Sequence, residues 1–150
     1  YLTGYEYLDL SLSYYRASLD KALAQETAAA LDFPPEKLGH KISSYSKGTA
    51  QKIGLISAFL VQRPLLILDE PMSGLDPLAR ICLKRKMQST RDAGNTLFFS
   101  SHILSDIDEI CDRIAILHQG TLRYTGTPQE FKKQYPAESL ETSFLQAIAV

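Results

Sequence analysis

The chain has little excess of either charge and no long apolar run. Its 150 residues include 16 Lys and Arg against 17 Asp and Glu, which gives a formal net charge of -1. A protein that neutralises many nucleic-acid phosphates needs a basic excess, so the composition gives no support for a nucleic-acid binder. No apolar stretch approaches the length of a membrane-spanning helix, and no signal peptide is visible. If the protein serves a membrane, we expect it to do so from outside the bilayer.

Cysteine is scarce as well. The two cysteines, Cys82 and Cys111, are isolated and form no CxxC motif. This pattern is typical of buried thiols in a cytosolic protein rather than of a disulfide or a metal site. The sequence has no internal repeat, and its hydrophobic content of 45% is ordinary for a globular protein. A chain of this length predicts one domain with its own core.

The segment Leu65-Leu66-Ile67-Leu68-Asp69-Glu70-Pro71 carries the strongest functional signal. Its four apolar residues predict a short strand that is buried on both faces, as in a parallel sheet. Asp69 and Glu70 then stand at the carboxyl end of the strand, where open α/β sheets bind ligands. One carboxylate can hold a metal ion, and its neighbour on the opposite side of the strand can hydrogen-bond to a water molecule. Two incidental acids at a solvated strand end are the simpler alternative for this segment alone.

Capping signals and hydrophobic spacing predict the remaining elements. Thr3-Gly4-Tyr5-Glu6 and Thr127-Pro128-Gln129-Glu130 are capping boxes, and Asp76-Pro77 is a typical helix start. Strands that alternate with helices after residue 48 favour an α/β fold with a mostly parallel sheet, and a hairpin at Gln119-Gly120 adds an antiparallel edge. We expect helices from residue 4, over 19–31, 48–62, 78–93 and 104–111 and after 127, with strands over 65–68, 96–100, 114–117 and 121–124.

Four motifs follow one another in a set order. They are Tyr45-Ser46-Lys47-Gly48, the strand with its two acids, Ser73-Gly74-Leu75-Asp76, and Ser100-Ser101-His102. In this order the chain resembles the nucleotide-binding domain of an ABC ATPase, with its signature motif, Walker B strand, D-loop and switch histidine. The YSKG form of the signature is most similar to ATPases of the ABC-2 exporter type, including the multidrug and antibiotic-resistance branch. The resemblance extends from the early helices to about Tyr135.

The resemblance implies a role for each motif residue. Ser46, Lys47 and Gly48 would bind the γ-phosphate of ATP held by an opposite subunit, and Asp76 would lie at the dimer interface. Asp69 would hold Mg²⁺, Glu70 would orient the attacking water, and His102 would act as the switch histidine. Lys47, Thr49 and Lys52 depart from the commonest signature, which has glycine, glutamine and arginine at these positions.

Each of these residues also has an ordinary structural interpretation. Ser46 and Asp76 can be simple helix N-caps, and His102 can be a satisfied turn histidine. A catalytic triad of Ser101, His102 and Asp106 is rejected because the three are too local in sequence and no nucleophile elbow exists.

The sequence contains no GxxxxGK[ST] motif and no Gly-Lys pair at all. A phosphate-cradling P-loop is therefore absent from these residues, and a truncated sequence is the simplest interpretation. We expect the segment alone to bind ATP weakly, not to hydrolyse it, and to expose sheet surface that a missing half would cover. The resemblance divides the chain into a helical subdomain at 3–44, the C-terminal part of a P-loop NTPase-like catalytic core at 45–135, and a tail at 136–150.

The function implied is that of an ATP-binding and ATP-hydrolysing subunit that powers export through a separate transmembrane permease. Two such domains would enclose two ATP molecules, and the subunit would be cytoplasmic and peripheral on the inner face of the cell membrane. No nucleic-acid partner is expected. A soluble ABC-type ATPase that acts on ribosomes or nucleic acid, and a non-catalytic interaction module of the same fold, stay as alternatives. A short helix is also possible in the tail, which contains Phe144, Leu145, Ile148 and Val150.

Overall fold

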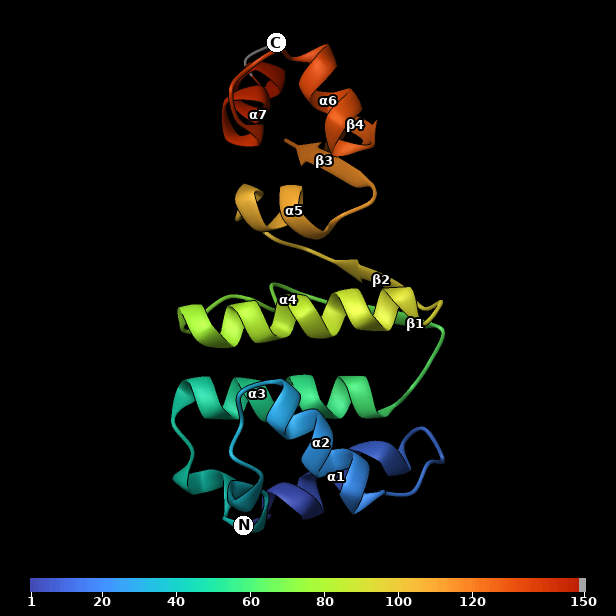
Figure 1. Cartoon of the computed structure of the whole chain (residues 1–150), viewed down its shortest axis with the longest axis vertical. Coiled ribbons are helices and arrows are strands. Elements are labelled where there is room, and N and C mark those ends of the chain that lie inside the picture. Colours follow the sequence, from blue (N-terminus) through green and yellow to red (C-terminus); the bar gives the residue numbers. More distant parts are fainter. Residues whose placement is uncertain (149–150) are drawn as a thin grey trace. The chain divides into compact units, whose positions relative to one another are not determined.

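The computed structural model describes residues 1–148, which form two compact units. Unit 1 is Tyr1–Ser100, and unit 2 begins at Ser101. Figure 1 shows the elements of both units in chain order, from blue at the N-terminus to red near the C-terminus. The division predicted from the sequence, at residues 44 and 135, is based on function and not on compactness. It stays a prediction.

Unit 1 begins with helices, as the sequence predicted. The Thr3 side chain accepts a hydrogen bond from the Glu6 N–H and completes the predicted capping box, while Asp20 caps the second helix. Two short 3₁₀ helices, which the sequence analysis did not anticipate, connect the second and third α-helices. The elements are α1 (Gly4–Ser13), α2 (Lys21–Ala30), η1 (Pro35–Gly39), η2 (Ile42–Ser44) and α3 (Lys47–Leu60).

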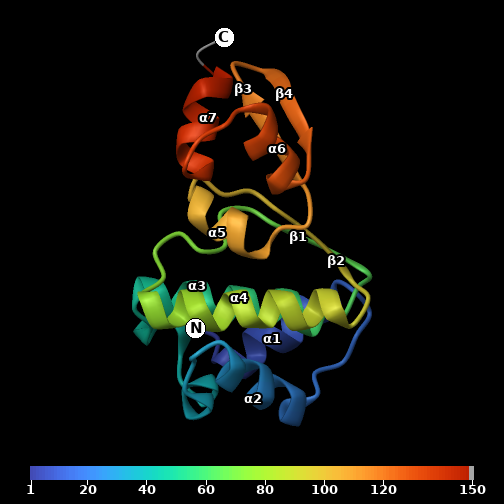
Figure 2. The same ribbon diagram turned by 45° about the horizontal axis from the view of Figure 1, so that its top comes forward.

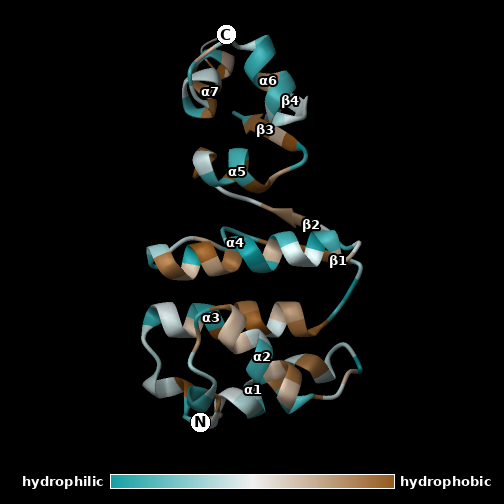
Figure 3. Cartoon of the chain, viewed as in Figure 1, coloured by the Kyte–Doolittle hydropathy of each residue, from teal (hydrophilic) through white to brown (hydrophobic). Residues whose placement is uncertain are grey.

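The helix α3 is the central element of unit 1. Both views show α1 and α2 on one side of α3 and the strands β1 and β2 on the other (Figures 1 and 2). Leu8, Ala28 and Ile56 are completely buried between the helices. Figure 3 shows the apolar residues concentrated in the second half of α3. Burial of these side chains packs α3 against the helices before it.

A β–α–β unit completes unit 1. It consists of β1 (Leu65–Leu68), α4 (Pro77–Asp92) and β2 (Thr96–Phe99). The two strands pair in parallel, with Leu65 opposite Thr96 and Leu68 opposite Phe99. The parallel arrangement places the carboxyl ends of both strands at the same edge, which brings residue 69 close to residue 100.

The prediction that β1 is buried on both faces is wrong for the described residues. Leu65, Ile67 and Phe98 share one face and are 51%, 67% and 63% exposed. The other face carries buried Leu68. The difference arises because, within residues 1–148, β1 pairs with β2 alone and other elements cover only one face of this two-stranded sheet. The exposed apolar face is the uncovered sheet surface that the sequence analysis expected.

In its described part, residues 101–148, unit 2 combines a hairpin with three helices. Its elements are α5 (Leu104–Ile110), β3 (Ile114–His118), β4 (Thr121–Gly126), α6 (Pro128–Gln134) and α7 (Leu140–Ile148). The predicted Gln119-Gly120 turn joins antiparallel strands, and both of its residues have positive φ, at 48° and 73°, as a tight hairpin turn requires. The core residues of this unit are Ile116, Phe131, Leu140 and Ala147.

The α/β class is confirmed, but a single mostly parallel sheet is not formed within residues 1–148. The hairpin makes its own two-stranded sheet instead of adding an edge to β1 and β2. The helix that the tail suggested is present as α7, although Val150 lies outside the described residues. None of the helices in residues 1–148 has the length and apolar character required to cross a membrane.

The two cysteines are free thiols, as expected, but each is half-buried rather than fully buried. Burial, together with the charge of Asp112, raises the pKa of the Cys111 thiol to about 11. The folded pKa lies above the unfolded value, so the thiol's contribution to stability is complete below about pH 9 and is lost as the pH rises towards 11.

We expect Cys111 to resist alkylation in the folded protein. At pH 8 a thiol with this pKa is ionised to about one part in a thousand, and the thiolate is the reactive species. Iodoacetamide at pH 8 should label Cys111 at least about tenfold more slowly in the folded chain than in urea, as measured by mass spectrometry of the peptide. Equal labelling rates in the two states would contradict the shielding of this thiol.

Candidate functional site

The first turn of α3 holds the predicted signature residues. Ser46 is the N-cap, and its hydroxyl accepts a hydrogen bond from the Thr49 N–H at 3.2 Å and shares a second with Thr49 Oγ1 at 2.8 Å. Ser46 and Lys47 are exposed, and Gly48 is half-buried. The serine is thus a helix N-cap, and Thr49 holds its hydroxyl.

An open cavity of about 230 Å³ lies beside this cap. Its lining includes the cationic Lys37, together with His40, Ser46 and Thr49. A helix N-terminus with a hydroxyl and a nearby ammonium group favours an anionic ligand. The residues present therefore fit a phosphate group at the start of α3.

The two acids at the end of β1 are held from the neighbouring strand. The Glu70 N–H donates to Ser100 Oγ at 2.9 Å, and the Ser100 hydroxyl donates to Asp69 Oδ1. Glu70 has a positive φ of 45°, so the chain turns sharply at this residue. Asp69 is exposed and Glu70 is half-buried. The Ser100 hydroxyl therefore links the backbone of Glu70 to the carboxylate of Asp69.

The loop after Glu70 is anchored to α3. The Gln51 side chain donates from Nε2 to the Pro71 carbonyl at 3.2 Å, and Met72 is buried. Gly74 has a φ of 74°, which favours glycine. A Cβ added to Gly48 would lie 3.8 Å from the Gly74 carbonyl, in ordinary van der Waals contact, so the start of α3 and this loop lie next to each other.

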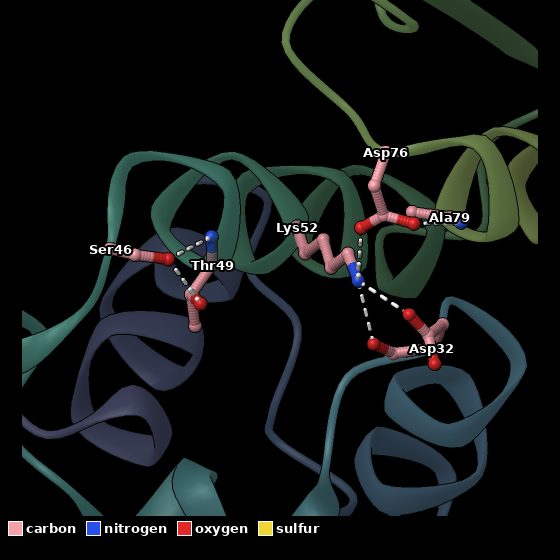
Figure 4. A network of polar contacts seen from close by, with 6 residues as sticks. All are labelled: Asp32, Ser46, Thr49, Lys52, Asp76 and Ala79. Carbon is pink, nitrogen blue, oxygen red and sulfur yellow. Dashed lines mark hydrogen bonds and ion pairs between the residues drawn. The ribbon is translucent and has the colours of Figure 1, made fainter.

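Asp76 ends this loop and caps α4. Its Oδ1 accepts a hydrogen bond from the Ala79 N–H at 2.9 Å. This hydrogen bond, with a further contribution from the Lys52 ammonium, lowers the pKa of the Asp76 carboxyl below its usual value. The pKa is depressed in the folded state, so the cap is complete at neutral pH and is lost as the pH falls through the lowered pKa. Lys52 Nζ lies 3.7 Å from Asp76 Oδ2, and Figure 4 shows this contact between α3 and the start of α4.

Unit 1 therefore brings together most of the predicted site residues. The signature turn, the loop with Asp76 and the strand end with Asp69 and Glu70 are joined by direct contacts. His102 belongs to unit 2, where it is exposed, and its place beside the carboxylates stays a prediction. Sequence reasoning missed the anchoring roles of Gln51, Lys52 and Ser100, because none of them belongs to a periodic or capping pattern.

The carboxylates also fit magnesium. Mg²⁺ in phosphate-transfer sites is held by one or two carboxylates together with water and substrate phosphates. Asp69 is exposed at the strand end, and no group of three or more His, Cys, Asp or Glu residues within 1–148 forms an all-protein metal cage. The exposed Asp69 carboxylate can supply one ligand to such an ion.

Comparison with known families defines the class first. The family model "AAA domain, putative AbiEii toxin, Type IV TA system" matches residues 27–105, about half of the chain. This range contains the signature turn, both acids and Asp76. Residues 27–105 thus match a family of AAA domains.

The similarity to individual proteins shows that the chain belongs to the family of ABC transporter ATP-binding proteins. It is 41% identical over 133 residues to an uncharacterised ABC transporter ATP-binding protein of Nostoc sp., covering 87% of the chain and 40% of the relative. It is 36% identical to the ABC-type transporter ATP-binding protein EcsA of Bacillus subtilis, covering 89% of the chain and 55% of the relative. It is 37% identical to the bacitracin transport ATP-binding protein BcrA of Enterococcus faecalis, and this match covers 81% of the chain and 39% of the relative. The chain thus spans roughly 40 to 55% of the length of these relatives.

Solved structures agree on the fold. The ATP-binding subunit of an ABC transporter superposes with a TM-score of 0.84 at 31% identity, covering 97% of this chain and 62% of that one. The dimeric structure of a bacterial ABC transporter cassette gives a TM-score of 0.74 at 20% identity, and the match covers 84% of this chain and 56% of that one. At this identity the likeness supports the fold alone. The chain is therefore a homologue of ABC transporter ATP-binding subunits with the corresponding α/β fold.

Proposed function

We propose that this chain supplies the signature turn and the catalytic carboxylates of an ATP-hydrolysing subunit that powers export. The observation that carries the proposal is the direct connection between the α3 cap and the loop after Asp69 and Glu70, made by Gln51 and Lys52. A helix start that favours phosphate and a pair of acids that fits magnesium and water occur in one compact unit. Phosphoryl transfer needs both parts.

Each side chain has a distinct task under this proposal. Ser46, Lys47 and Gly48 bind the terminal phosphate of an ATP molecule presented by a second ATP-binding domain. Asp69 holds Mg²⁺, which neutralises developing charge on the phosphates when it is bound. Glu70 orients a water molecule and accepts its proton, and His102 binds the phosphate from the following segment. Asp76 stabilises the loop that faces the second domain.

The proposed partners follow from these roles. A second ATP-binding domain, identical or different, completes each ATP site, and a transmembrane permease subunit uses the resulting closure. The subunit is then cytoplasmic and peripheral to the membrane, and the nearly neutral charge supports the absence of a nucleic-acid partner. In a protein as long as these relatives, further strands would pair beside β1 and β2 and produce the mostly parallel P-loop NTPase-like sheet. The helical subdomain at 3–44, the core at 45–135 and the tail at 136–150 remain the functional division that we propose.

The proposal is tested by comparing the full-length protein with residues 1–150 alone. We expect the full-length protein to release phosphate from MgATP, and residues 1–150 to bind MgATP with a Kd above about 1 mM and to hydrolyse none. The shorter chain contains no GxxxxGK[ST] cradle, so it holds only the signature and the carboxylates. Isothermal titration and a phosphate-release assay make the measurement. A full-length protein without hydrolysis would contradict the function, and tight MgATP binding by residues 1–150 would contradict the assigned roles.

A further inference from the structure

Asp32 is outside every motif, yet it makes two contacts with one cation. It follows α2 with a positive φ of 52°, a conformation that aspartate and asparagine adopt more readily than other non-glycine residues. Lys52 Nζ donates to the Asp32 backbone carbonyl at 2.8 Å and to its carboxylate at 2.7 Å. The left-handed turn therefore brings both oxygens of one residue to the same ammonium group.

Lys52 is well shielded and has a third partner. Its side chain is 12% exposed, against 38% for Asp32 and 58% for Asp76. The same Nζ that contacts Asp32 lies 3.7 Å from Asp76 Oδ2, while the other Asp76 oxygen caps α4. Figure 4 shows Lys52 reaching from α3 towards both acids, which come from different elements. A shielded ammonium group is costly without partners, so these contacts restrict where α3 can lie.

The position of Lys52 on α3 links its contacts with Asp32 and Asp76 to the proposed site. Thr49, which fixes the Ser46 hydroxyl, precedes Lys52 by three residues and lies one helical turn closer to the cap. Gln51, the residue before Lys52, holds the Pro71 carbonyl. A shift of Lys52 along or around the helix axis would therefore move both the signature turn and its contact with the loop.

We propose that Asp32 and Lys52 form a clasp that positions the signature turn against the loop ending at Asp76. This inference rests on the proposed function, and both are positioning residues because neither is assigned a contact with ATP. The clasp joins the end of α2, the first half of α3 and the start of α4. Its loss lets the signature turn and the loop move independently, which slows formation of the competent site and leaves the intrinsic affinity for nucleotide nearly unchanged.

The first test measures local order by amide hydrogen exchange in the full-length protein. Asp32→Asn keeps the backbone carbonyl and suits the positive φ but removes the charge, whereas Lys52→Met removes the cation and keeps an unbranched side chain. In both variants we expect the Thr49 and Ala79 amides, which donate to Ser46 and Asp76, to exchange about tenfold faster. Lys52→Arg should restore slow exchange. Asp92→Asn, which breaks the exposed Arg91–Asp92 ion pair on α4, is the matched control and should change neither amide.

Two exchange results would overturn the clasp. One is unchanged exchange at Thr49 and Ala79 in both Asp32→Asn and Lys52→Met. The other is an equal increase at all protected amides of unit 1, which would indicate a general loss of stability. These readouts need no ATP hydrolysis, so they decide the clasp even if the proposed function fails.

The second test measures steady-state hydrolysis by the same full-length variants. Asp32→Asn and Lys52→Met should each lower kcat about tenfold, with KM for ATP within about twofold of the parent value. The double variant should be no slower than the single ones, because both substitutions break one interaction. Multiplicative losses in the double variant, or an increased KM with an unchanged kcat, would overturn the inference. An inactive parent protein would count against the proposed function alone.

Discussion

Glu70→Gln in the full-length protein should lower the rate of ATP hydrolysis at least about a hundredfold. The substitution keeps the size of the side chain and leaves the Glu70 N–H free to donate to Ser100 Oγ, but it removes the group that accepts a proton from water. The loss should fall on kcat, because the proposed contacts with the phosphates come from other residues. Phosphate release at saturating MgATP measures the effect.

Nucleotide binding and a surface variant provide the controls for this substitution. Glu70→Gln should bind MgATP as tightly as the parent and should favour the ATP-bound dimer, since closure no longer leads to hydrolysis. Glu26→Gln, on an exposed position of α2, should hydrolyse at the parent rate. Hydrolysis that persists unchanged in Glu70→Gln would remove this residue from the catalytic role.

Phe131→Ala should unfold unit 2. Phe131 is completely buried, and its ring lies 4.8 Å from that of Tyr124 and 5.1 Å from that of Tyr135 between centroids. Truncation of a buried phenylalanine typically costs about 3–5 kcal/mol, because the transfer free energy of the ring and its contacts are both lost. A unit of this size buries a small core and has little stability to lose.

Hydrogen exchange resolved by segment measures this prediction. Amides of β3, β4 and α7 should lose protection in Phe131→Ala, whereas those of α3 should keep it. Leu145→Ala on α7 is the matched control, since Leu145 is 60% exposed and its truncation should change stability by no more than about 0.5 kcal/mol. Retained protection in β3 and β4 would contradict the central place of Phe131 in this core.

Local signals explain which elements the sequence predicted well. Both capping boxes, the Asp76 cap and the Gln119-Gly120 turn involve residues within four positions of one another, and the structure confirms each of them. The exposure of one face of β1 could not be predicted from such local signals. Four consecutive apolar residues indicate burial on both faces, but the number of elements that cover a strand depends on the rest of the fold.

The same distinction separates the parts of the candidate site. Asp69, Glu70 and Ser46 were identified because they belong to short motifs with a set order. The Asp32–Lys52 contact joins residues 20 positions apart, and Ser100 approaches Asp69 across 31 positions. No spacing rule marks such pairs, since they form only when α2, α3 and the two strands are already packed.

The backbone at Glu70 also implies a conflict between folding and chemistry. A left-handed residue that is neither glycine nor asparagine costs about 1 kcal/mol, and glycine would relieve that strain. Glycine, however, has no carboxylate. Under the proposed function, the position is therefore one where selection for activity outweighs selection for stability, and a search for more stable variants would favour replacements here that destroy the enzyme.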